Sequence, residues 1–125
     1  MRKTTSVTIA ALFAAVQFAA APVRADPPVI EAVRSDSLGG AWTFSVTIRH
    51  PDTGWDHYAD GWEVLAPDGS RLGYRELLHP HVDEQPFTRS LAGVLIPPGT
   101  EFVTVRSRCN VDGWSAPGRR VQLGR

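Results

Sequence analysis

The stretch AWTFSVTIR, residues 41–49, alternates large apolar with smaller or polar side chains at every second position. Because successive side chains of a β-strand point to opposite faces, this alternation predicts a strand with one face in a core and the other in water. Tight turns with Pro and Gly, such as Pro67-Asp68-Gly69, divide the surrounding sequence into further short runs of the same kind. These predicted strands are residues 29–34, 58–65, 71–78, 87–96, 101–108 and 121–123.

About seven short strands without a helical period are typical of an immunoglobulin-like sandwich or a small barrel. We therefore predict an all-β fold, an immunoglobulin-like antiparallel β-sandwich of about seven strands. One domain is expected, since residues 26–125 are 100 residues long.

Residues 1–25 have the organisation of a secretory signal peptide. Arg2 and Lys3 precede an apolar, alanine-rich run, and small residues at Val23 and Ala25 fit a cleavage site before Asp26. The apolar run is shorter than a bilayer span, and no second one follows, so no membrane span is predicted. We expect a periplasmic or secreted β-sandwich domain over residues 26–125.

The charge of that domain argues against some partners. Ten arginines, thirteen Asp and Glu residues and no lysine lie between residues 26 and 125. A mildly acidic chain without a basic run is not expected to bind nucleic acid or an anionic membrane. The oligomeric state is left open.

All four histidines and the single cysteine lie in loops that an up-and-down sheet brings to one end. HPDTGWDH (residues 50–57), HPHVDEQP (residues 79–86) and CNVDGW (residues 109–114) each follow a predicted strand. Complete hairpins separate the three loops, so they return to the same end of the sheet. The residues expected to meet there as metal ligands are His50, His57, His79, His81 and Cys109.

Imidazole nitrogen and thiolate sulfur are ligands for iron, copper or zinc rather than for calcium or magnesium. Carboxylates of the same loops, among them Asp52 and Asp112, are expected as further ligands or as acceptors for the histidine N–H groups. Histidines in exposed loops are, alternatively, often merely polar. A lone cysteine outside the cytoplasm is likewise either buried and inert, a metal ligand or a reactive thiol.

Two of these loops resemble those of the superoxide reductases, the neelaredoxin and desulfoferrodoxin group. HPDTGWDHYADGWEVL is similar to that family's histidine–proline loop and following strand, and RCNVDGW to its late cysteine loop. The resemblance covers most of residues 41–114. It implies an immunoglobulin-like sandwich carrying an iron site with a redox function.

Carried over by residue, the resemblance makes His50 and His57 equatorial ligands and Cys109 the axial thiolate. Asp112 stands where that family has a further histidine, and whether it replaces that ligand is open. A second similarity, to the sulfur-oxidation Z proteins, rests on an HP-x-TG-type segment and implies a scaffold for partners rather than an enzyme.

Two functions follow as expectations. The first is a periplasmic metal-binding sandwich with a redox or metal-handling role, served by a redox donor or another protein partner. The second is a non-catalytic immunoglobulin-like module whose loops contact a protein partner, with Trp55 as an anchor.

Overall fold

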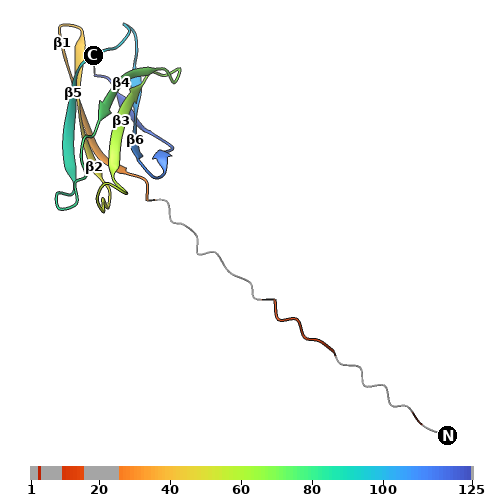
Figure 1. The fold of residues 1–125 in the computed structure, drawn as a ribbon. Helices are drawn as coiled ribbons and strands as arrows, with labels where there is room; N and C mark the ends of the chain where they lie inside the picture. Colours follow the sequence, from red (N-terminus) through yellow and green to blue (C-terminus); the bar gives the residue numbers. More distant parts are fainter. Residues whose placement is uncertain (1–2, 4–9, 16–25, 125) are drawn as a thin grey trace.

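The computed structural model describes residues 3, 10–15 and 26–124. The predicted signal peptide, residues 1–25, lies largely outside the described residues. Where residues 10–15 are described they form no regular element, and Leu12 and Phe13 are almost fully exposed. They lie away from the folded body in Figure 1. Among the described residues, no helix is long and apolar enough to cross a membrane.

Residues 29–122 form eight antiparallel strands in two sheets, and the all-β sandwich predicted from the sequence is confirmed (Figure 1). The three-stranded sheet has the order β1-β2-β5, and the five-stranded sheet has the order β4-β3-β6-β7, with β8 also paired to β6. The bounds are β1 Val29–Leu38, β2 Ala41–Arg49, β3 Ala59–Leu65, β4 Arg71–Glu76, β5 Phe87–Leu95, β6 Phe102–Cys109, β7 Gly113–Trp114 and β8 Arg119–Gln122.

The strands differ from the predicted ones mainly at the two ends of the domain. β1 continues to Leu38, because it pairs with β2 along its whole length until Gly39 and Gly40 turn the chain with φ of 62° and 86°. Positive φ is accessible to glycine at little cost, so the turn forms at these two glycines and the strand extends beyond the predicted residue 34. The two-residue strand β7 was not predicted, since so short a segment carries no alternation.

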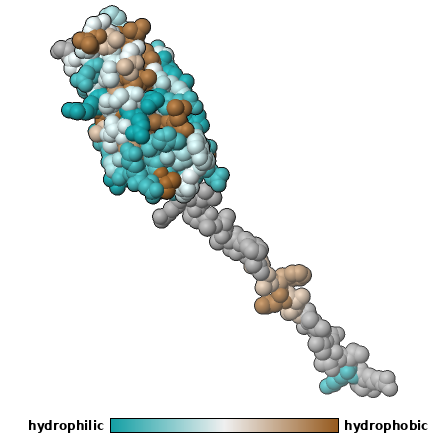
Figure 2. Space-filling view, turned by 60° about the vertical axis from the view of Figure 1, so that its left-hand side comes forward, coloured by the Kyte–Doolittle hydropathy of each residue, from teal (hydrophilic) through white to brown (hydrophobic). Residues whose placement is uncertain are grey.

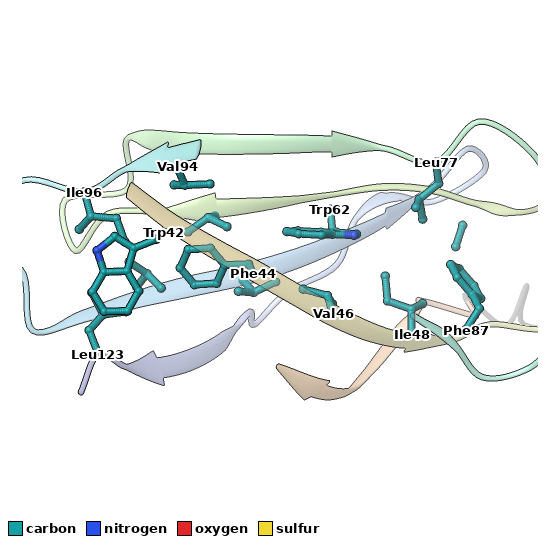
Figure 3. Packing of buried hydrophobic residues seen from close by; sticks show 14 residues of the cluster. Trp42, Phe44, Val46, Ile48, Trp62, Leu77, Phe87, Val94, Ile96 and Leu123 are labelled. Atoms are coloured by element: carbon teal, nitrogen blue, oxygen red, sulfur yellow. The ribbon is translucent and has the colours of Figure 1, made fainter. Parts of the chain in front are cut away.

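The core lies between the sheets and follows the alternation of residues 41–49. Side chains of β2 alternate strictly between buried and half-buried positions, and Figure 3 shows Phe44, Val46 and Trp62 among the packed side chains. Trp62, on β3, is completely buried. The buried apolar cluster comprises Trp42, Phe44, Val46, Ile48, Ala59, Trp62, Val64, Leu77, Phe87, Val94, Ile96, Val103, Val105 and Leu123.

Strands β2, β4 and β6 all run toward one end of this core, so the loops that follow them share that end (Figure 1). We call it the ligand end and define it as residues 50–58, 77–86 and 109–112. Direct hydrogen bonds join its segments: the His81 N–H donates to Asp52 Oδ2 at 2.8 Å, and the Asn110 N–H donates to the Tyr58 carbonyl at 3.1 Å. The placement expected from strand order is thereby confirmed.

Candidate metal centre

The loop between β2 and β3 presents two histidines by folding back on itself. The Thr53 N–H donates to the His57 carbonyl at 3.0 Å, and the His57 N–H donates to the Gly54 carbonyl at 3.2 Å. Asn110 then ties this loop to the end of β6, because its Nδ2 donates to the Trp55 carbonyl at 3.0 Å and its Oδ1 accepts the Tyr58 N–H at 2.9 Å. These hydrogen bonds place Cys109 beside the two imidazoles.

Three side chains of the ligand end form a group that can hold a metal ion. One ligand atom from each of His50, His57 and Cys109 lies within 4.8 Å of the other two. The Cys109 Sγ is 3.6 Å from His57 Nε2, and the two imidazole rings meet edge to face with centroids 4.8 Å apart. His50 and Cys109 are completely buried and His57 is half-buried. The group therefore opens toward solvent on the His57 side.

His50 is oriented by a buried carboxylate. Its Nδ1 lies 2.5 Å from Asp52 Oδ1, and both side chains are inaccessible to solvent. A carboxylate accepts hydrogen bonds, so Nδ1 carries the proton and Nε2 carries the free lone pair. That Nε2 is buried without a hydrogen-bond partner among the described residues. A buried nitrogen with an unused lone pair is unusual, and its need for a partner is what a metal ion would satisfy.

Asp52 holds more than the imidazole. Its Oδ1 also accepts the Ala59 N–H at 2.9 Å, and its Oδ2 accepts the His81 N–H at 2.8 Å. Gln85 joins the same two loops a second time: its Oε1 accepts the His50 N–H at 3.0 Å and its Nε2 donates to the His81 carbonyl at 2.8 Å. The loop of residues 77–86 is thus bonded to the backbone and to the carboxylate that position His50.

The Cys109 thiol is held close to Asp112. Burial raises the pKa of the Cys109 thiol, and the Asp112 N–H, which donates to Sγ at 3.2 Å, partly opposes that rise. The Asp112 carboxylate lies 3.5 Å from Sγ and accepts from the thiol. In the absence of a cation the neutral thiol is therefore favoured, and a bound cation would favour the thiolate.

His79 and His81 lie at the same end but outside this group of three. Their rings lie beside each other with centroids 4.5 Å apart, and the His81 ring stacks on Phe87 at 3.9 Å. Arg89 Nη2 is 2.8 Å from His81 Nε2. A guanidinium only donates, so the lone pair of that nitrogen is already used and the proton sits on Nδ1. His79 is exposed, with Nδ1 3.1 Å from the Pro80 carbonyl.

Of the five ligand residues expected from the sequence, the structure brings three within bonding range of a common ion. The expected acceptor role of a loop carboxylate is taken by Asp52. Gln85, Asn110 and Arg89 were not singled out. Arg89 occupies a ring nitrogen of His81, and Gln85 and Asn110 hold the loops that carry the histidines and Cys109. No sequence pattern marks these three residues, because Gln85 and Asn110 bond to a loop 35 or more residues distant and Arg89 lies on β5 rather than in a polar loop.

Comparison with known proteins adds little to this geometry. No protein-family model matches the chain, and no solved structure matches it. A Halomicrobium mukohataei protein named "Putative lipoprotein" is 44% identical over 86 residues, which is 69% of this chain. The match covers 42% of that relative, so the chain corresponds to less than half of its length.

Proposed function

We propose that this protein binds a transition-metal ion through His50, His57 and Cys109. The observation that carries the proposal is the buried, unpartnered His50 Nε2, directed by Asp52 in a group whose ligand atoms lie within 4.8 Å of one another. Two imidazoles and a thiolate fit copper, iron or zinc. The Asp52–His50 pair matches the carboxylate–histidine arrangement that fixes the tautomer of a ligating imidazole.

A redox or metal-handling role outside the cytoplasm is the form of this proposal that the chain supports best. Three protein ligands leave a coordination position open, and a thiolate ligand would supply electron density to a redox-active ion. The predicted signal peptide and the lipoprotein name of the Halomicrobium mukohataei relative support an extracytoplasmic location.

The superoxide reductase likeness is part of the proposal. The two histidines and the cysteine that the likeness assigns as ligands are the three residues of the group. Asp112 differs from that family's late histidine, and its carboxylate lies 3.5 Å from Sγ. We propose a related site with fewer imidazoles.

Elemental analysis of protein recovered from cells that express the full chain tests the proposal. We expect about one equivalent of copper, iron or zinc, lost in His50→Gln and Cys109→Ser and kept in His79→Gln, which alters an exposed histidine outside the group. Metal should also slow alkylation of Cys109. A wild-type protein that binds none of the three metals when they are supplied would refute the metal site.

A second candidate is a module that binds a protein partner through the same loops. The observation in its favour is Trp55, which is 66% exposed and rests edge to face on Tyr58 at 5.6 Å. Exposed tryptophan often anchors protein interfaces.

A further inference from the structure

The ligand end combines negative charge with exposed apolar side chains. Its three segments contain five carboxylates and no arginine or lysine. Asp56, Asp83 and Asp112 are exposed, and no salt bridge found among the described residues involves them. Of the arginines nearest in sequence, Arg49 pairs with Glu31 and Arg108 with Asp60, both outside the ligand end, and Arg89 pairs with Glu84 of the ligand end.

Apolar side chains of all three segments are exposed at the ligand end. Trp55, Leu78, Val82 and Val111 are 66%, 67%, 51% and 58% exposed. Val111 follows Asn110, whose side chain donates to the Trp55 carbonyl. Val82 follows His81, whose N–H donates to Asp52. Figure 2 shows a small brown, apolar patch at the end of the body from which the N-terminal segment leaves, which is the ligand end, and larger brown areas at the opposite end and on the side of the body.

We propose that the ligand end docks a protein partner whose contact surface combines basic and apolar side chains. The inference rests on the proposed function, because a partner seated there would cover the open side of the metal group and reach the ion. Charge selects this occupant over two others. An anionic membrane would be repelled by the exposed carboxylates Asp56, Asp83 and Asp112, and a second copy of this chain would bring like charges together. A basic partner is attracted, while the exposed apolar side chains provide contact area.

The opposite end of the sandwich provides an internal comparison. Leu38 and Leu95 are 88% and 72% exposed there. The turns at that end, residues 39–40, 66–70 and 96–101, contain only Asp68 and Glu101 as acidic residues, and Asp68 accepts hydrogen bonds from Ser70. Exposed apolar side chains thus occur at both ends. The larger number of carboxylates and the metal group occur at the ligand end. A purely hydrophobic contact would not distinguish the two ends.

The test is NMR titration of the isotope-labelled protein, recovered from cells that express the full chain, with cytochrome c as the basic probe. Cytochrome c with succinylated lysines is the matched control, since its basic charge is removed. We expect chemical-shift changes confined to residues 50–58, 77–86 and 109–112, absent with the succinylated probe. Affinity should fall by about tenfold in Trp55→Ser and remain unchanged in Leu95→Ser.

Several results would overturn the docking proposal. These are no shift at saturating cytochrome c, shifts at the opposite end, equal losses in the two variants, or binding of anionic lipid vesicles at the ligand end. Repeating the titration with Cys109→Ser separates the two proposals, because Cys109 is completely buried and its loss leaves the surface unchanged. We expect Cys109→Ser to dock as the wild type does. A wild-type protein that docks the probe but binds none of the supplied metals would refute only the metal site, whereas metal binding without docking would refute only the interface.

Discussion

Asp52 is a single carboxylate on which three N–H groups converge, from His50, Ala59 and His81. Its side chain is inaccessible to solvent, so water cannot replace a lost acceptor. Removing a buried acceptor lowers the free energy of unfolding far more than removing an exposed one, because its donors stay buried without a partner. The stability of the loops and the orientation of the proposed ligand therefore depend on the same two oxygen atoms.

Asp52→Asn is expected to lower the free energy of unfolding by about 2–4 kcal/mol, since an amide nitrogen would replace one acceptor. Metal affinity should fall roughly 10–100-fold, because the His50 tautomer would no longer be fixed. Urea unfolding and metal titration measure the two effects. Asp56→Asn, at an exposed position of the same loop, is the control. Equal behaviour of the two variants would contradict the role given to Asp52.

His81 should make stability depend on pH. Burial, followed by the charge of Arg89, lowers the pKa of His81 below its ordinary 6.5. At neutral pH the imidazole is uncharged in both states. As the pH falls through 6.5 the unfolded chain takes up a proton that the folded protein resists, so stability decreases until the pH reaches the lower folded pKa.

We expect His81→Gln to flatten this part of the curve of unfolding free energy against pH, whatever it does to the absolute stability. His79→Gln serves as the comparison, since His79 is exposed and should leave the slope nearly as it was. Urea midpoints between pH 5 and 8 give the slopes. A wild-type slope retained in His81→Gln would show that other groups cause it.

Strands β3, β4 and β6 are joined on their outer face by a charged ladder. Glu63 of β3 is 2% exposed and accepts from Arg71 of β4 at 2.7 Å and Arg106 of β6 at 2.5 Å. Trp114 of the short strand β7 lies over both guanidinium groups, 5.5 Å and 5.0 Å from its ring centroid. Its ring also meets Tyr74 edge to face. The carboxylate is tolerated because two cations and an aromatic cover surround it.

Glu63→Gln is expected to destabilise the domain by about 2 kcal/mol, because the buried amide nitrogen could not accept a hydrogen bond from either arginine. Glu76→Gln, at an exposed position of β4, should cost less than about 0.5 kcal/mol. Chemical denaturation with both variants measures the difference. If both variants lost similarly little stability, solvent would screen the ion pairs of Glu63 and these pairs would contribute little to folding.

At the scale of the whole molecule, the proposed metal site spans the two sheets. His50 follows β2 of the three-stranded sheet, and Cys109 ends β6 of the five-stranded sheet. An ion bound to both residues would tie the sheets together at the ligand end and would bind the folded state in preference to the unfolded one. Ligand binding of that kind stabilises a protein by an amount that grows with the logarithm of the ratio of free ligand concentration to Kd.

Metal at about a thousandfold excess over its Kd should raise the free energy of unfolding by about 4 kcal/mol. Treatment with a chelator should remove this gain in the wild type, and Cys109→Ser should show none. Calorimetry with and without metal measures the shift in Tm. An equal shift in Cys109→Ser would place the bound metal elsewhere on the chain.

Seven of the eight strands, the turns between them and the end at which the polar loops gather could be predicted from local sequence patterns. These features depend on local alternation and on the conformations of Pro and Gly. The order of the hairpins follows from the succession of strands and turns along the chain. The class of the fold follows from them, as does the presence of His50, His57 and Cys109 at one end.

Which of the expected ligand residues meet could not be predicted, because it depends on contacts between distant segments. Arg89 occupies the lone pair of His81, Asp52 leaves that of His50 free, and Asn110 brings Cys109 to His57. The burial of Glu63 between two arginines is equally invisible in the alternation of β3. Such outcomes depend on contacts between segments far apart in sequence, where side-chain geometry and desolvation, rather than local pattern, determine the partner of each polar atom.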